Sequence, residues 1–176
     1  ATHIAERMKL DGNVTAWDIH RHRVELIKKN VERMGAVIVN PMLNDAREYM
    51  PQMECSIDRV LIDAPCSGWG IIHKKPDIKL KSHNTELKEL QNIQWQILST
   101  CCRYVKPGGV LVYSTCTINP DENERIIERF LNSYKEFFMK DITEYTPVQL
   151  RPFIRNRGMI QLIPSRDGMD GFFISK

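Results

Sequence analysis

Two short polar segments, each with a cysteine, follow apolar runs that are typical of buried strands. Residues 63–68 read Asp-Ala-Pro-Cys-Ser-Gly after the run 57–62, and residues 113–117 read Tyr-Ser-Thr-Cys-Thr at the end of the run 110–113. The carboxylate, the rigid proline and the cysteine of the first segment would form a rigid surface that presents reactive groups. A helix beginning soon after Cys116 would lower the pKa of that thiol and favour the thiolate. Two such loop thiols predict nucleophilic chemistry in which a second group assists.

The cysteines do not indicate disulfides or a metal site. Cys66 has an alternative interpretation as a small buried hydrophobe, which its polar, loop-forming flanks disfavour. Cys55, Cys101 and Cys102 lie in or beside apolar stretches and are expected to be core or structural residues. The set of five is odd in number, lacks a C-x-x-C pair and follows no signal peptide. We therefore expect free thiols, no zinc or other metal, and a reducing, cytoplasmic compartment.

Two further carboxylates are candidates for binding a nucleoside. Asp18 ends a short apolar run, and an acid at that position typically accepts hydrogen bonds from a ribose diol, in enzymes that use NAD as in those that use S-adenosylmethionine (SAM). Asp45 follows a second apolar run and is suited to an adenine amino group. Each also has a structural alternative, because an aspartate before a helix can cap its first turn. Residue type alone leaves both interpretations open.

The elements that would position these residues alternate between strands and helices. Apolar runs predict strands, and apolar residues at helical spacing predict helices. Gly35 is expected to end the first long helix, and residues 106–109 (Lys-Pro-Gly-Gly) to form a tight turn. The expected strands are 14–17, 36–39, 57–62, 110–113, 159–163 and 171–175; the expected helices are the first few residues, 20–34, a turn at 46–50, 86–105 and 119–138.

This alternation predicts an α/β fold with a mostly parallel, doubly wound sheet and helices on both faces. The last two strands would add an antiparallel edge. We expect one domain over residues 1–176, because the length suits a single core. In such folds ligands bind beyond the carboxyl ends of the strands, so Asp18, Asp45, Asp63, Cys66 and Cys116 are all expected at one edge.

Composition excludes several classes of protein. The chain is 42% hydrophobic and 27% charged, and no apolar run approaches the roughly 20 residues of a membrane helix, which excludes disordered, collagen-like and transmembrane chains. The formal net charge is +3, and the stretches 66–88 and 147–168 each carry a net charge of +3 as well. Each stretch is either a solvated face or a surface that contacts phosphates.

The motifs together resemble a known family, the SAM-dependent RNA cytosine-5 methyltransferases of the Sun/Fmu (RsmB-type) group. The matching segments are D-A-P-C-S-G at 63–68, K-K-P-D-I-K at 74–79, K-P-G-G at 106–109, Y-S-T-C-T-I-N-P-D-E-N-E at 113–124 and D-G-F-F at 170–173. The K-K-P-D-I-K segment favours the bacterial 16S ribosomal RNA branch. The resemblance implies a Rossmann-like fold, SAM as cofactor and RNA, ribosomal in this branch, as partner.

The resemblance also implies a role for each candidate residue. Cys116 would be the nucleophile, Cys66 would assist product release, and Asp63 would lie between the methyl donor and the target base. Asp18, with Arg23 nearby, would hold the SAM ribose, and Asp45 would bond the adenine. The expected phosphate contacts are Lys74, Lys75, Lys79, Arg151, Arg155 and Arg157.

Family members carry a first strand and a P-G-G-K-T loop just before the helix that opens this chain, and an amino-terminal RNA-binding region before that. We therefore expect a catalytic domain truncated at its amino end, without that strand and loop. Two other functions stay open at this point. A non-catalytic RNA-binding fragment would explain the basic stretches, and an NAD-dependent oxidoreductase would explain Asp18 but neither cysteine motif.

Overall fold

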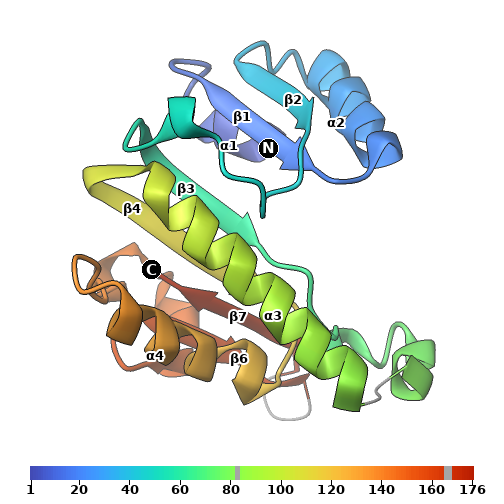
Figure 1. Ribbon diagram of the computed structural model, residues 1–176. Helices are drawn as coiled ribbons and strands as arrows, with labels where there is room; N and C mark the ends of the chain where they lie inside the picture. Colours follow the sequence, from blue (N-terminus) through green and yellow to red (C-terminus); the bar gives the residue numbers. More distant parts are fainter. Residues whose placement is uncertain (82–83, 165–167) are drawn as a thin grey trace. The chain divides into compact units, whose positions relative to one another are not determined.

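The computed structural model describes residues 1–81, 84–164 and 168–176 (Figure 1). They divide into two compact units, Ala1–Tyr49 and Met50–Lys176, which are described separately below. Both units are built from α/β elements, and each contains one pair of parallel strands joined by a helix.

In the first unit a helix connects two parallel strands. The elements are α1 (Thr2–Arg7), β1 (Val14–Asp18), α2 (Arg21–Met34) and β2 (Val39–Leu43). The register runs from Val14 opposite Val39 to Asp18 opposite Leu43. Ala5, Ala36 and Val39 form the buried core, against which Val14 and Val31 pack. Asp18 therefore lies at the carboxyl end of β1, where the sequence placed it.

The second strand begins later than predicted. Gly35 adopts φ +60° as the cap of α2, and the Ala36 amide donates to the Val31 carbonyl at 3.0 Å. This cap uses the first residues of the apolar run 36–39 to turn the chain, so β2 begins only at Val39. Pro41 lies within β2, which is possible because a two-stranded sheet contains only edge strands.

The second unit contains a five-stranded sheet with the order β3-β4-β7-β6-β5. β3 and β4 are parallel, and the remaining neighbours are antiparallel. The strands are β3 (Ile57–Asp63), β4 (Val105–Thr115), β5 (Ile154–Arg155), β6 (Met159–Leu162) and β7 (Phe172–Ser175). The expected α/β class, with parallel strands followed by an antiparallel carboxyl-terminal set, is confirmed.

Two helices lie side by side in this unit (Figure 1). α3 (Asn84–Cys101) connects β3 to β4, and α4 (Glu124–Ser133) follows β4. Their contact includes the Arg129 guanidinium, 3.8 Å from the centre of the Trp95 ring. Short 3₁₀ turns complete the unit: η1 (Pro51–Met53), η2 (Trp69–Ile71), η3 (Pro76–Lys81), η4 (Cys102–Tyr104), η5 (Pro120–Glu122), η6 (Thr143–Tyr145) and η7 (Val148–Phe153).

Several predicted boundaries are wrong by a few residues. The helical turn expected at 46–50 occurs at η1, α3 ends at Cys101 instead of Val105, and α4 ends at Ser133 instead of Phe138. β4 is longer than predicted: Ile57 is opposite Val105 but Arg59 is opposite Val110, so residues 106–109 bulge out of the ladder. The predicted tight turn is therefore a bulge inside β4, which Gly108 permits at φ +77°.

A thiol pair at the ends of β3 and β4

Cys66 and Cys116, here called the thiol pair, lie in contact although they are fifty residues apart in the chain. Their sulfurs are 3.3 Å apart, and both residues are half-buried. The contact follows from the sheet, because β3 and β4 are parallel neighbours and Asp63 is opposite Ser114 in their register. The Ser114 hydroxyl donates to Asp63 Oδ1 at 3.3 Å. The structure thus brings together three of the predicted site residues, Asp63, Cys66 and Cys116.

The pair divides into a thiol donor and a thiolate acceptor. The pKa of Cys116 is lowered to about 7, chiefly by the hydrogen bond from Cys66 and to a smaller extent by the nearby positive charge of Lys75. Burial and the carboxylate of Asp63 oppose this shift. The same hydrogen bond, with burial and the charge of Cys116, raises the pKa of Cys66. Near neutral pH Cys116 is therefore readily available as a thiolate, the form that acts as a nucleophile.

A buried carboxylate that was not predicted from the sequence lies next to the segment that carries Cys66. Glu122, at the end of η5, is completely buried. Its two oxygens accept four hydrogen bonds of 3.1 Å or less, from the Ser67 amide (2.8 Å), the Ser67 hydroxyl (2.6 Å), Gln94 Nε2 (3.0 Å) and Asn119 Nδ2 (3.1 Å). Gln94 Nε2 also donates to the Pro65 carbonyl at 2.8 Å. The carboxylate is thus tied to the backbone on both sides of Cys66.

Asn123 makes hydrogen bonds to the residues on both sides of Cys116. Its Oδ1 accepts from the Thr115 hydroxyl at 2.6 Å, and its Nδ2 donates to the Thr117 carbonyl at 3.0 Å and to Gln161 Oε1 at 2.9 Å. The sequence assigned Asn123 no role beyond its place in the matching segment 113–124 and in the predicted helix 119–138. One signal was present in the sequence: Glu122 and Asn123 precede the apolar Ile126 and Ile127 by four residues, which places them on the same buried face.

Glycines bring the backbone close to the thiol pair. The Gly70 amide donates to the Cys116 carbonyl at 3.1 Å, and the Gly171 amide donates to the Gly70 carbonyl at 2.8 Å. A Cβ atom on Gly70 would lie 2.3 Å from the Gly171 oxygen and 2.7 Å from the Cys116 oxygen. The glycine at position 70 therefore permits a backbone junction that fixes the segment after Cys66 against Cys116, while Gly68 supplies the turn at φ +72°.

In the first unit, the carboxylate of Asp18 lies near the residues expected around it. Its Oδ1 accepts from the His20 amide at 2.8 Å, and Arg23 Nη1 is 3.7 Å from its Oδ2. Asp18 therefore stabilises the start of α2, as the structural alternative expects, and also has the predicted neighbour Arg23. Ile19, His20 and His22, which follow Asp18 in the chain, line a surface depression of ≈ 720 Å³.

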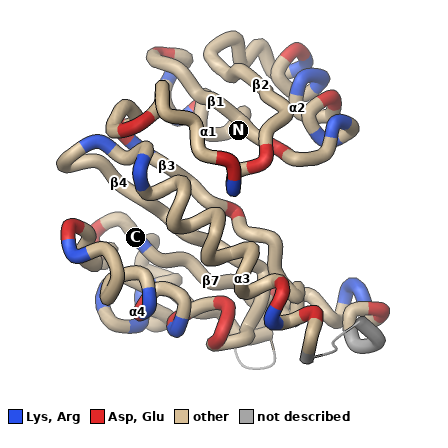
Figure 2. Tube along the Cα trace, in the orientation of Figure 1, with Lys and Arg blue, Asp and Glu red and all other residues tan. Residues whose placement is uncertain are grey.

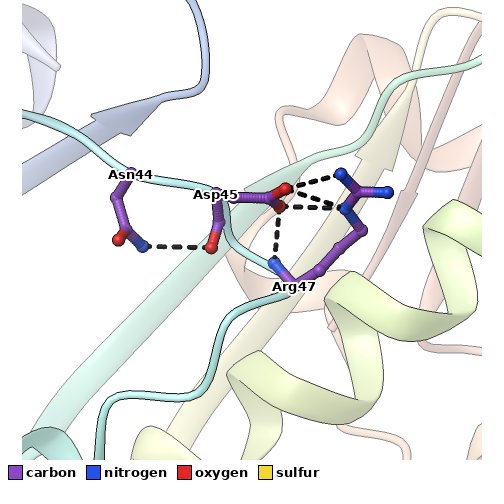
Figure 3. A network of polar contacts seen from close by, with 3 residues as sticks. All are labelled: Asn44, Asp45 and Arg47. Atoms are coloured by element: carbon purple, nitrogen blue, oxygen red, sulfur yellow. Dashed lines mark hydrogen bonds and ion pairs between the residues drawn. The ribbon is translucent and has the colours of Figure 1, made fainter.

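Asp45 is engaged by a single arginine (Figure 3). Arg47 donates its backbone amide to Oδ1 at 2.9 Å, its Nε to both oxygens at 3.0 Å and its Nη2 to Oδ2 at 2.5 Å. These bonds, the side-chain ones above all, hold the pKa of Asp45 below its usual range. The Asp45 carboxylate stabilises a tight turn, as the structural interpretation of this residue expects. A ligand that binds this carboxylate would have to share its oxygens with Arg47.

Lysines and arginines are spread over several elements of the described chain (Figure 2), and the residues expected to contact phosphate have different surroundings. Lys74 Nζ pairs with Asp170 Oδ2 at 2.5 Å, whereas the positive charge of Lys75 lowers the pKa of Cys116. The Lys79 side chain lies outside the described part of the structure. Arg151 Nε donates to the Thr146 carbonyl at 3.2 Å.

Arg155 ends β5, and Arg157 lies in the turn between β5 and β6. Met159 lies opposite Ser175, and Ser175 opposite Tyr113, so this turn faces away from the carboxyl end of β4 that carries Cys116.

The described residues form neither a metal-binding cluster nor a membrane-spanning helix. Within residues 1–81, 84–164 and 168–176, no group of three or more His, Cys, Asp or Glu side chains is arranged to hold a metal ion. Over the same ranges, no helix combines the length and the apolar character needed to cross a membrane.

Known proteins resemble the chain over nearly all of its length. It is 42% identical over 176 residues to the probable ribosomal RNA small subunit methyltransferase B of Bacillus subtilis, covering 99% of this chain and 39% of that protein. It is 31% identical over 189 residues to the mouse 28S rRNA (cytosine-C(5))-methyltransferase, covering 99% of this chain and 23% of that protein. The chain thus spans less than half the length of either relative.

A solved structure, that of PH0851, has the same fold. It is 35% identical and superposes with a TM-score of 0.86, over 98% of this chain and 38% of that chain. The resemblance expected from the cysteine motifs is thereby confirmed by relatives and by structure. The family model described as 16S rRNA methyltransferase RsmB/F matches residues 1–176, so the chain belongs to the RsmB/F family.

Proposed function

We propose that the chain carries the catalytic residues of an RNA cytosine-5 methyltransferase that uses SAM and acts on ribosomal RNA. The observation that carries this proposal is the thiol pair, with its sulfurs 3.3 Å apart beside Asp63 at the carboxyl ends of β3 and β4. Family membership and the names of the two relatives support the reaction type, and the mouse relative's name supports carbon 5 of cytosine.

The first step is attack by Cys116. Carbon 5 of cytosine is a poor nucleophile, so a methyl group cannot be transferred to it directly. When the Cys116 thiolate forms a bond to carbon 6, the electron pair of the 5,6 double bond becomes available at carbon 5. The lowered pKa of Cys116 supplies that thiolate near neutral pH. A carboxyl group at Asp63, placed at the N3/N4 edge of the base, would stabilise the charge that develops on the ring.

Product release needs a base for the carbon-5 proton. After methylation, that proton must leave, the 5,6 double bond re-forms and the Cys116 sulfur departs as a thiolate. We assign the proton acceptor to Cys66, or to a water molecule that Cys66 holds. The negative charge of Cys116 is one cause of the raised pKa of Cys66, and that charge is absent while Cys116 is bound to the base. Cys66 is therefore easier to deprotonate in the adduct than in the free protein.

The residues of the first unit are suited to the cofactor. We expect Asp18 to accept from the ribose diol and the exposed Ile19 to provide an apolar surface for the adenine. Arg23 orients Asp18, and Asp45 would bond the adenine while it keeps part of its contact with Arg47. When bound, SAM supplies the methyl group as an electrophile. The base must be unpaired or flipped out of its stack to reach Cys116.

A methyl-transfer assay tests this function. The purified protein is incubated with SAM carrying a labelled methyl group and with small-subunit ribosomal RNA, and the RNA is digested to nucleosides. We expect the label in 5-methylcytidine, and none with Cys116→Ala. Label on a ribose oxygen or on another base would overturn the proposal. If the protein binds the RNA but calorimetry detects no binding of SAM, the result would instead favour the non-catalytic RNA-binding function.

A further inference from the structure

The buried carboxylate of Glu122 takes no part in the chemistry described above, yet it lies between the two segments that carry the thiols. We propose that Glu122 is a positioning residue that holds Cys66 and Cys116 in contact. The catalytic meaning of that contact depends on the proposed function, but the positioning itself does not.

The hydrogen bonds of Glu122 join the residues that directly follow each cysteine. Ser67, which follows Cys66, donates both its amide and its hydroxyl to the carboxylate. The Ser67 oxygen also lies 2.8 Å from the hydroxyl of Thr117, which follows Cys116. The Thr117 hydroxyl also donates to Glu122 Oε2 at 3.4 Å, so the carboxylate contacts the residue after each cysteine. The sequence Thr117, Ser67, Glu122 thus forms one chain of hydrogen bonds across the two segments.

Only a carboxylate satisfies all the donors around this position. An ionised carboxylate offers about four lone-pair sites and no proton, and four donors surround Glu122 within 3.1 Å. A glutamine would have to keep its oxygen toward the Ser67 amide and Gln94. Its NH₂ group would then meet the NH₂ group of Asn119, two donors with no acceptor between them. Hydrogen bonds to a buried charge are also stronger than neutral ones, which favours a fixed geometry.

A mere nearby negative charge and a residue that holds the thiol pair together would shift the pKa of Cys116 in opposite directions, which makes the proposal testable. The groups that act on the Cys116 thiol are Cys66, Asp63 and Lys75, with the Cys66 hydrogen bond the largest influence. If Glu122 acted only as a nearby negative charge, its removal would make Cys116 more acidic. If it holds the thiol pair together, its removal weakens the Cys66 hydrogen bond and makes Cys116 less acidic.

The experiment measures alkylation of Cys116 by iodoacetamide as a function of pH, with peptide mass spectrometry to separate it from the other cysteines. We expect the wild-type rate to titrate near the pKa of about 7. For Glu122→Gln we expect an alkaline shift of about 1 pH unit, toward the ordinary cysteine value of about 8.5. Asp121→Asn, at a neighbouring half-buried carboxylate that pairs with Arg125, is the matched control and should titrate like wild type.

An unchanged or acid-shifted profile in folded Glu122→Gln would overturn the proposal. If that variant does not fold, Ser67→Ala decides, because it removes one hydroxyl from the chain of hydrogen bonds and leaves the carboxylate in place. We expect a smaller alkaline shift from Ser67→Ala, restored by Ser67→Thr, and an unshifted profile would again overturn the proposal. The assay needs neither RNA nor SAM. If Glu122→Gln shows the alkaline shift but the wild-type protein forms no 5-methylcytidine, the proposed function is rejected and the positioning role is kept. If the wild-type protein forms 5-methylcytidine but Glu122→Gln shows no alkaline shift, only the positioning role is rejected.

Discussion

At the scale of single residues, the two cysteines differ because one donates to the other. The hydrogen bond that lowers the pKa of Cys116 raises that of Cys66, so one contact produces both a more acidic and a less acidic thiol. The sequence predicted both cysteines as reactive from their polar flanks. It did not reveal the contact, which depends on a 3.3 Å approach between residues fifty positions apart.

Cys66→Ala should make Cys116 a weaker nucleophile at neutral pH. The change removes the donor that contributes most to the lowered pKa of Cys116, so that pKa rises from about 7 toward about 8.5. The thiolate fraction at pH 7 then falls roughly 15-fold, and the alkylation rate of Cys116 falls with it. The loss should be recovered as the pH rises above 9. Cys55→Ala, at an exposed cysteine outside the site, is the control; a Cys66→Ala rate equal to wild type at pH 7 would contradict the assignment.

Asp18→Ala should weaken SAM binding about 10- to 100-fold, because a hydrogen bond to a charged group contributes about 1.5–3 kcal/mol. Calorimetry measures the dissociation constant directly. Asp11→Ala, at an exposed aspartate in the same unit, is the matched control. Equal affinities for Asp18→Ala and the control would remove Asp18 from the cofactor site. Since Asp18 and the thiol pair belong to different units, the thiol chemistry of the variant should stay unchanged.

At the scale of elements, the parallel pair β3 and β4 determines where the chemistry lies. Asp63 and Thr115 end these strands as the apolar runs predicted, so the segments after them share one edge of the sheet. The boundaries that were wrong have local causes. The cap at Gly35 shortened the second strand, and the bulge at 106–109 allowed β4 to continue through a predicted turn. Hydrophobic periodicity does not report on either feature.

Gly70→Ala should disrupt the junction between the segments of the thiol pair. The added methyl group would overlap the Gly171 and Cys116 carbonyl oxygens, so the backbone must move, at a cost of about 1–3 kcal/mol in the free energy of unfolding. We also expect slower alkylation of Cys116 at pH 7. Gly35→Ala is a useful comparison: it meets open space and carries only the cost of its positive φ, about 1 kcal/mol. Denaturant unfolding measures both, and an equal or smaller loss for Gly70→Ala would count against the junction.

At the scale of the whole molecule, the α/β class and the family could be predicted from the order of elements and from the two cysteine motifs. The hydrogen bonds of the buried polar residues around the thiol pair could not. Glu122 lies four residues before Ile126, so its spacing indicates a buried face, but side chains of the type of Glu122 and Gln94 are usually exposed, and only the folded structure shows that both are completely buried and which groups they bind. Their burial is tolerated because each makes hydrogen bonds to the segments that carry the chemistry.

The proposed reaction requires a covalent bond between the Cys116 sulfur and carbon 6 of the target base. RNA containing 5-fluorocytosine tests it most directly, because fluorine at carbon 5 cannot leave as a proton does and the adduct persists. After incubation with SAM and digestion with protease and ribonuclease, mass spectrometry identifies the peptide that carries the nucleotide. We predict the peptide containing Cys116, with the adduct absent in Cys116→Ala and present in Cys66→Ala. An adduct on Cys66 that survives Cys116→Ala would reverse the roles, and no adduct on either thiol would contradict the account.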